Sequence, residues 1–246
     1  MRRLLLATAF LAPFAFQPAR AEEFTKAQIE EIVRQYIADH PQELVDSVQR
    51  LQDQKVKAED AASVKIINDN RNWLEKNKNH AEAGNPKGDV TIVEFFDYNC
   101  GYCKQALGDL MTLLDKDKNV RLVFVEIPIL GDSSILAAQW ALAAKAQDGN
   151  YLAYHTALMK NRGPLNDETL KNHAKAAGLD IARLEKDRTD PKINDIISEN
   201  LNMARAVGIQ GTPAFIIGDQ VIRGYVGIEG LTEAVANARK AKAEKK

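Results

Sequence analysis

Apolar residues recur at helical spacing near the start of the chain. Between residues 25 and 51 they stand three or four positions apart, which predicts two amphipathic helices separated at Asp39-His40-Pro41. Thr25 and Gln28 have the spacing of a capping box, so the first helix should begin there, and we expect His40 to be a turn or cap residue. The apolar positions are Ile29, Ile32, Val33, Tyr36, Ile37, Leu44, Val45, Val48 and Leu51. Two short helices cannot bury a sizeable core alone, so this apolar face needs a partner, and we expect that partner to be the same segment of other copies.

Polar residues and helix formers dominate the next stretch, residues 52–84. We expect a polar helical linker there, because few large apolar residues are present and proline is missing from its first part. Trp73 and Leu74 should mark the return of the chain to the core. Residues 80–88, which contain two glycines and a proline, are expected to form a loop.

Strand and helix signals alternate from residue 90 onward. Ile92 to Phe96 is a short apolar run of β-branched and aromatic residues, which is typical of a fully buried strand. Apolar residues at helical spacing between Ala106 and Leu114 predict a helix, and Val120 to Ile127 predicts a second strand. Strand, helix and strand in this order favour a right-handed unit with parallel strands.

A long helical stretch separates these strands from the rest of the predicted sheet. The expected helices cover residues 133–142, 151–159, 167–177, 181–187 and 191–207. Together they are too long for one crossover, so we interpret them as a helical insertion into an α/β core. A strand should then begin at Pro213, turn at Gly218-Asp219 and return over residues 220–223. A helix over residues 228–238 should follow, with a basic tail at 239–246 that frays.

The only two cysteines of the chain, Cys100 and Cys103, stand where the buried strand gives way to the helix. The N-terminus of a helix favours an anion, so a thiolate at Cys100 should be stabilised and its pKa lowered. Gly101 and Tyr102 lie between the cysteines and permit a tight turn. A Cys-x-x-Cys pair after a strand in such a unit is typical of a thioredoxin-like redox motif.

Two other interpretations of the cysteine pair are a structural zinc site and an inert disulfide. Structural zinc needs four ligands, and no second cysteine pair is present. The histidines, at positions 40, 80, 155 and 173, are scattered without ligand spacing, and we expect His155 and His173 to be surface or core residues. An inert disulfide would close so short a loop that it would constrain little of the unfolded chain.

Composition suggests an exported protein with an ordinary core. Residues 1–21 combine Arg2 and Arg3, an apolar run and the small-residue site Ala19-Arg20-Ala21, which is the pattern of a cleaved signal peptide. The 246 residues are 45% hydrophobic and carry a formal net charge of −1, which grows more negative when the three arginines of that peptide leave. This balance of acidic and basic residues does not indicate a surface that binds nucleic acid. Export to an oxidising compartment, the periplasm, fits a redox pair of cysteines.

These residues also resemble a known family. The run Phe-Phe-Asp-Tyr-Asn-Cys-Gly-Tyr-Cys at 95–103, the helical insertion, and Gly211 to Phe215 followed by Gly218 are similar to thiol–disulfide oxidoreductases of the DsbA family. Residues 36–41 resemble the N-terminal extension of the ScsC-like branch. The resemblance implies an α/β, thioredoxin-like fold with a helical insertion, preceded by a helical extension. The implied organisation is a signal peptide (1–21), an oligomerisation segment (22–51), a polar helical linker (52–84) and a catalytic domain (85–242) with an insertion at about 133–207.

The same resemblance implies roles for individual residues. Cys100 would be the nucleophile and Cys103 the resolving thiol. Pro213 would be a cis-proline facing the disulfide, with Thr212 shaping redox behaviour and substrate contact; the alternative for Pro213 is an ordinary proline at a strand start. Glu94 would be a buried acid that assists proton transfer to the resolving thiol, unless it points to a solvated sheet edge.

Two sites, the pair between the cysteines and the residue before Pro213, depart from the best-known oxidase of the family. Gly101-Tyr102 replaces Pro-His between the cysteines, which removes a positive partner of the thiolate, and Thr212 replaces Val. With the N-terminal extension, both favour a periplasmic disulfide isomerase or reductase that self-associates through residues 24–51. It would take protein substrates and a membrane redox partner, and would need no cofactor or metal. A monomeric net oxidase and a copper-binding thiol protein remain as alternatives.

Overall fold

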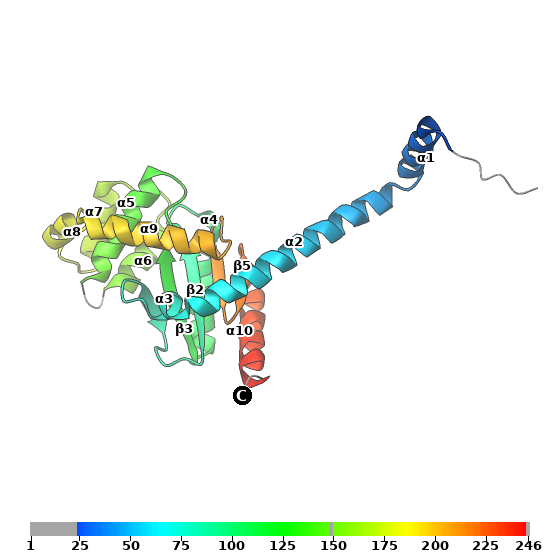
Figure 1. The fold of residues 1–246 in the computed structure, drawn as a ribbon. Coiled ribbons are helices and arrows are strands. Elements are labelled where there is room, and N and C mark those ends of the chain that lie inside the picture. The colour runs from blue at the N-terminus through cyan, green and yellow to red at the C-terminus, as the bar shows by residue number, and fades with distance from the viewer. Residues whose placement is uncertain (1–23, 148–149, 245–246) are drawn as a thin grey trace, which may run out of the picture. The chain divides into compact units, whose positions relative to one another are not determined.

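The computed structural model describes residues 24–147 and 150–244, and Figure 1 shows their elements. The signal peptide expected at residues 1–21 lies outside this range. Internal contacts divide the chain into two compact units, one ending at Asp53 and one beginning at Gln54. Within the described ranges, no helix is both long and apolar enough to cross a membrane.

The first unit contains α1 (Lys26–Asp39) and the beginning of α2 (Pro41–Asp69). Thr25 caps α1 through the predicted capping box, since its N–H donates to Oε1 of Gln28 over 2.9 Å while its hydroxyl accepts from the Gln28 N–H. His40 is the C-cap of α1, as expected. The tyrosine hydroxyl of Tyr36 reaches across the break to Oε2 of Glu43 (2.8 Å). Every residue of the predicted apolar face is exposed, at between 45% and 58%.

The second unit begins inside α2, and its sheet begins earlier in the chain than the sequence indicates. Ile67 of α2 and Leu74 of α3 (Arg71–Lys76) are buried in its core. The expected loop at residues 80–88 is wrong for Ala81–Gly84, which form β1, an edge strand paired antiparallel with β3. The residue types of this strand, Ala, Glu and Gly, have low β-propensity, so the sequence carries no strand signal there. The strand forms because β3 offers it a partner.

A five-stranded sheet in the order β1-β3-β2-β4-β5 forms the centre of the second unit. β2 (Val90–Phe96) and β3 (Val120–Glu126) run parallel with α4 (Gly101–Lys116) between them in sequence, as predicted. β4 (Ala214–Ile217) pairs antiparallel with both β2 and β5 (Gln220–Arg223). The insertion forms α5 (Asp132–Lys145), α6 (Tyr151–Lys160), α7 (Asp167–Ala176), α8 (Ile181–Asp187) and α9 (Pro191–Ala206), and α10 (Gly227–Glu244) follows the sheet. The expected α/β class, with its insertion and preceding helices, is confirmed.

Helices cover both faces of the sheet, so the central strand β2 is buried on both sides. Ile92 and Phe96 point to the core shared with α4, α6 and α10, whereas Val93 and Phe95 point to the core shared with α3 and α9. Side chains alternate along a strand, so Glu94 lies on the same face as Ile92 and Phe96. It is therefore directed into the core that also contains the cysteines.

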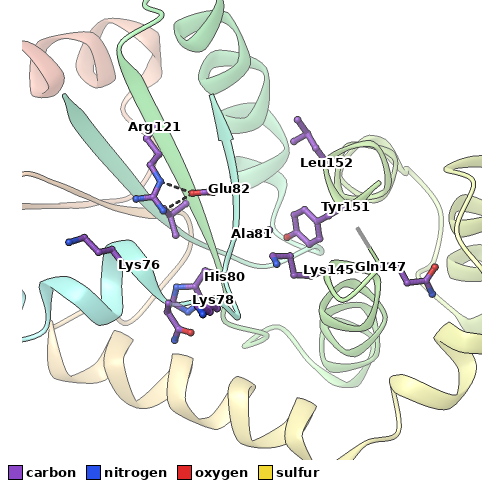
Figure 2. Close-up of a pocket in the computed structure, with 12 residues that line it drawn as sticks. Lys76, Lys78, His80, Ala81, Glu82, Arg121, Lys145, Gln147, Tyr151 and Leu152 are labelled. Atoms are coloured by element: carbon purple, nitrogen blue, oxygen red, sulfur yellow. Dashed lines mark hydrogen bonds and ion pairs between the residues drawn. The ribbon is translucent and has the colours of Figure 1, made fainter. Parts of the chain in front are cut away.

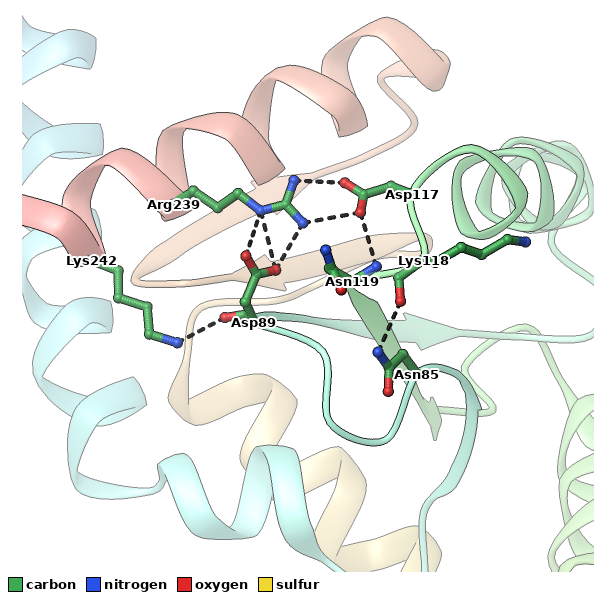
Figure 3. A network of polar contacts seen from close by, with 7 residues as sticks. All are labelled: Asn85, Asp89, Asp117, Lys118, Asn119, Arg239 and Lys242. Carbon is green, nitrogen blue, oxygen red and sulfur yellow. Dashed lines mark hydrogen bonds and ion pairs between the residues drawn. The ribbon is translucent and has the colours of Figure 1, made fainter.

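The end of α10 is anchored to the sheet rather than frayed, so the expectation of a fraying tail is wrong up to Glu244. Figure 3 shows the guanidinium of Arg239 between two carboxylates, with Nη2 2.8 Å from Asp89 and Nη1 2.6 Å from Asp117. Lys242 donates to the carbonyl oxygen of Asp89 over 2.9 Å. Sequence alone could not assign these partners, since they lie far away along the chain.

We predict that Arg239→Ala lowers the free energy of unfolding by about 1 kcal/mol, because a partly exposed guanidinium that bridges two carboxylates sits at the upper end of surface ion pairs. Arg239 lowers the pKa of both Asp89 and Asp117 below the ordinary 3.8. Its contribution is therefore present above that value and is lost as the pH falls through the lowered pKa values. Urea unfolding at pH 7 and in acid measures both effects. Lys240→Ala, on an exposed neighbour, is the control, and an equal loss there would contradict the prediction.

Candidate active site

Cys100 is the N-cap residue of α4, at the point where β2 ends and the helix begins. Its N–H donates to the carbonyl oxygen of Asp97 (3.0 Å), which closes the turn after the strand. Its sulfur accepts from the backbone N–H of Cys103, with a distance of 3.3 Å. Cys100 is 6% exposed and Cys103 is fully buried, and the two sulfurs are not bridged. The pair thus stands at a helix N-terminus with only one member open to solvent.

The Thr212–Pro213 segment lies against this pair. Its peptide bond is cis, and β4 begins immediately after it at Ala214. Because β4 runs antiparallel to β2, its first residues lie beside the end of β2 that carries the cysteines, with Ala214 opposite Phe95. The Cys100 thiol donates to the carbonyl oxygen of Thr212 over 3.2 Å. Two motifs far apart in sequence are therefore brought together in one site.

Hydrogen bonds stabilise the thiolate of Cys100. They lower its pKa from 9.0 to about 6, with the contact to the Cys103 side chain as the largest cause. Burial opposes this shift, while Thr212 and the backbone N–H groups of Cys103 and Tyr102 add to it. Cys100 is therefore mainly a thiolate at neutral pH, which is the nucleophilic form. The expected lowering of this pKa at a helix N-terminus agrees with the geometry.

The pKa values of Cys103 and Glu94 are raised, whereas that of Cys100 is lowered. Burial, together with the hydrogen bond to Cys100 and the charge of Glu94, raises the pKa of the Cys103 thiol far above its usual range. Glu94 is 1% exposed, and neither of its carboxyl oxygens has a hydrogen-bond partner. Burial, and secondarily the charge of Cys100, raises the pKa of Glu94 to about 8. The solvated alternative for Glu94 is excluded, and a protonated carboxyl stands in the core near the buried thiol.

The exposed surroundings of the site are partly aromatic and partly polar. Tyr102, between the cysteines, is 61% exposed and stacks on Tyr225 with 6.1 Å between ring centroids. Lys104, directly after Cys103, donates to the carbonyl oxygen of Asn161 (2.8 Å). A cavity of about 390 Å³ lies against Thr212 and Pro213, and its other lining residues include Glu59 and Arg223. Neither cysteine lines this cavity, which therefore lies on the far side of the cis bond from the sulfurs.

Sequence reasoning missed the loop between β3 and α5 as part of this region. Ile129 and Leu130 in that loop are 42% and 52% exposed, and their backbone N–H groups bind the carboxylate of Asp97. The signal that could have revealed them is a pair of large apolar residues in a predicted loop, directly after Pro128. Asp97 itself could have been noticed as the first charged residue after a buried strand.

A second buried polar cluster lies behind the site. The Tyr98 hydroxyl is 3.0 Å from Nδ1 of His155, and the Tyr151 hydroxyl donates to Glu126 over 2.7 Å. Burial lowers the pKa of His155 to about 3, so this ring is neutral. Burial raises the pKa of Glu126 to about 7. His155 is therefore a buried core histidine, one of the two outcomes expected from the sequence.

The cavity in Figure 2 is separate from the cysteines. It has a volume of about 540 Å³, lies beside the edge strand β1, and neither cysteine lines it. Lysine side chains surround it, and the one arginine in its lining, Arg121, is paired with Glu82 through Nε over 2.6 Å. Among the described residues, no group of three or more His, Cys, Asp or Glu side chains could hold a metal ion.

A thiolate at a helix N-terminus, a buried partner thiol and an adjacent cis-proline on a thioredoxin-type sheet define a thiol–disulfide oxidoreductase. Residues 91–236 match the family model for the DSBA-like thioredoxin domain, and the chain belongs to this family. The expected family and its likeness to the ScsC-like branch are confirmed.

Solved structures agree with this assignment, and a curated protein of another name matches part of the chain. A thioredoxin-like oxidoreductase from Silicibacter pomeroyi is 44% identical, with a TM-score of 0.67, over 70% of this chain and 98% of that one. A linker-deletion variant of Proteus mirabilis ScsC is 26% identical, with a TM-score of 0.71, over 90% of this chain and all of that one. The Na(+)/H(+) antiporter NhaA 1 of Salinispora arenicola is 31% identical over 61% of this chain, and the matched part is 23% of that protein's length. The chain thus spans about a quarter of the curated relatives of this kind.

We predict that the reduced protein titrates with a thiolate midpoint near pH 6, followed by the ultraviolet absorbance of the thiolate or by alkylation rate. Cys103→Ala should move that midpoint up toward 9.0, because the largest cause of the lowered pKa is the Cys103 side chain. Cys103→Ser, which keeps a hydrogen-bond donor, is the matched control and should move it less. A wild-type midpoint close to 9.0 would contradict the geometry described above.

Proposed function

We propose that this chain is an exported, periplasmic oxidoreductase that exchanges disulfides in protein substrates, with a preference for isomerisation or reduction. The observation that carries the proposal is the Cys100 sulfur, which has a pKa of about 6 and lies 3.2 Å from the carbonyl oxygen of Thr212. A reactive thiolate beside an open strand start can receive a client segment at the sulfur itself. No cofactor or metal takes part in the exchange.

The chemistry needs only the two cysteines and the client. The Cys100 thiolate attacks one sulfur of a client disulfide, forming a mixed disulfide and releasing the other client sulfur as a thiolate. Cys103 then attacks Cys100, which frees the second client thiol and leaves the protein oxidised by two electrons. If a client thiolate attacks the mixed disulfide first, a new client disulfide forms and no electrons are transferred. That second outcome is isomerisation.

We propose that Glu94 accepts the proton that the Cys103 thiol must lose before it attacks. The Cys103 thiol is buried and has a strongly raised pKa, so it does not ionise without help. Glu94, with a pKa near 8 and no hydrogen-bond partner for its carboxyl oxygens, is mostly protonated at neutral pH, and its ionised fraction, which grows as the pH approaches 8, can accept the proton of Cys103. The charge of Glu94, like that of Cys100, contributes to the raised pKa of Cys103.

Thr212 and Pro213 are proposed to hold the client. Proline has no N–H, and the carbonyl oxygen of Thr212, which accepts from the Cys100 thiol, loses that donor when the thiol ionises and can then accept from a bound peptide. Gly101 carries no side chain, and a Cβ there would meet nothing within 4 Å apart from its two chain neighbours. Tyr102 is exposed beside them and offers an aromatic surface to the client.

The isomerase preference rests on two features. Thr212 stands where the best-known oxidase of the family has valine, and residues 24–51 carry an apolar face that is exposed throughout the first unit. We propose that this face associates with the same face of other copies, so that several active sites act on one client. A membrane redox partner would keep the cysteines reduced. The alternative is a monomeric net oxidase that donates its disulfide, and oligomeric state and redox potential separate the two.

The mechanism predicts a distinct result for each of three variants. Cys100→Ser should abolish reduction of insulin, because the attacking thiolate is gone. Cys103→Ser should accumulate a mixed disulfide with the client. Glu94→Gln should slow resolution of that mixed disulfide by about 10²-fold, the typical worth of a positioned base. Mass spectrometry of reactions quenched at successive times measures all three results. Full activity of Cys100→Ser would contradict the proposed function.

The oligomer hypothesis is tested in the full chain. The double variant Val33→Glu and Val45→Glu places charge on the exposed apolar face of α1 and α2. We expect the wild type to sediment as an oligomer that reactivates scrambled ribonuclease, and the variant to be a monomer that loses reactivation while still reducing insulin. Gln35→Glu and Gln49→Glu add the same charge at polar positions and should change neither property. A monomeric wild type with oxidase activity alone would favour the net-oxidase alternative.

A further inference from the structure

Asp97, the first residue after β2, has the most complete set of hydrogen bonds near the active site. It is 2% exposed. Its Oδ1 accepts from the N–H of Asn99 (2.8 Å) and the hydroxyl of Ser134 (2.7 Å). Its Oδ2 accepts from the N–H groups of Ile129 (2.8 Å) and Leu130 (3.0 Å). These four donors satisfy the buried carboxylate, and none of them is a thiol.

The segment that Oδ2 holds is the loop between β3 and α5. Pro128 contributes no N–H to this loop, and Gly131 adopts a φ of 117° just before α5. The carboxylate is therefore the partner of two successive N–H groups in a short connection. Without it, both groups would lose their acceptor at the margin of the core. The loop conformation that exposes Ile129 and Leu130 depends on this acceptor.

The other end of the same residue holds the cysteine turn. The carbonyl oxygen of Asp97 accepts from the N–H of Cys100, over 3.0 Å. Asn99, within the turn, adds hydrogen bonds from its amide to Ser133 (2.9 Å) and Ser134 (2.8 Å) at the start of α5. Asp97 thus contacts the cysteine turn through its backbone carbonyl, which a side-chain substitution keeps, and holds the exposed apolar loop through its carboxylate.

We propose that Asp97 is a positioning residue that fixes Ile129 and Leu130 beside Cys100, so that the loop contributes to the surface that binds protein clients. This rests on the proposed function of the cysteine pair. Asp97 acts through the loop and not on the reacting sulfurs. Its effect should therefore appear with a protein client, which is large enough to contact the loop, and not with a small disulfide that contacts the sulfur alone.

The test compares Asp97→Asn with the wild-type full chain on two probes. These are insulin, with glutathione as the reductant, and the small aromatic disulfide 5,5′-dithiobis(2-nitrobenzoic acid). An amide cannot accept four hydrogen bonds, so the loop should shift. We expect KM for insulin to rise by about tenfold with kcat within about twofold, and the rate with the small disulfide to stay within about twofold. Equal losses on both probes, or no change on insulin, would overturn the proposal.

Two comparisons separate positioning from loss of stability or charge. Asp117→Asn removes a carboxylate that binds Arg239 and the N–H of Asn119 at the opposite end of β3 from this loop, and it should lower stability without raising KM. The thiolate midpoint of Cys100 should stay close to the wild-type value in Asp97→Asn. A shifted midpoint with parallel changes on both probes would assign Asp97 an electrostatic role instead.

A double-mutant cycle tests whether Asp97 acts through the loop. Leu130→Ala should raise KM for insulin in the wild type, and it should add little in the Asp97→Asn background, because the side chain is already displaced. Effects that multiply would overturn the proposal. If Asp97→Asn does not fold, Ser134→Ala removes one of the four hydrogen bonds to the carboxylate, together with one of the two that the Asn99 amide donates, and should give a smaller rise in KM for insulin alone. If the wild type itself leaves the small disulfide intact, the proposed function fails rather than this inference.

Discussion

The site depends on the opposition between burial and hydrogen bonding at the sulfur of Cys100. Burial raises the pKa of a thiol, whereas hydrogen bonds to the thiolate lower it. At Cys100 the hydrogen bonds prevail, that of the Cys103 side chain most of all, and its pKa falls to about 6. At Cys103, three residues further along the chain, burial prevails, so its pKa is raised and the thiol keeps its proton. One turn of α4 thus separates a thiol that ionises near neutral pH from one that does not, and the proposed mechanism uses this difference.

The sheet creates the conditions for that opposition. Since β2 is buried on both faces, its carboxyl end delivers the cysteines to the margin of the core, where one sulfur meets solvent and the other does not. The antiparallel pairing of β4 with β2 brings Thr212 and Pro213 to the same margin. The burial of β2 on both sides also explains Glu94, because no solvated face exists toward which its carboxyl could turn.

The two units of the chain place their apolar residues differently. In the second unit the large apolar side chains of the strands are buried between helices, while in the first unit the whole apolar stripe is exposed. Exposed apolar surface on this scale commonly marks an interaction site. The proposed self-association through residues 24–51 rests on the same physical rule that accounts for the core, applied to helices that have no core of their own.

By itself, the sequence determined the features that depend on neighbouring residues. These include the capping box at Thr25, the handover from strand to helix at the cysteine pair, and the hairpin after Pro213, because each follows from local spacing and residue type. The tertiary structure decided whatever depends on residues distant along the chain. The strand at Ala81–Gly84 exists because β3 offers it a partner, and the last turns of α10 are ordered because Arg239 meets Asp89 and Asp117. The network of Asp97 likewise joins the end of one strand to the loop after the next. A single sequence carries no record of which distant groups meet, so those contacts, and the surface they build around Cys100, appear only in the folded chain.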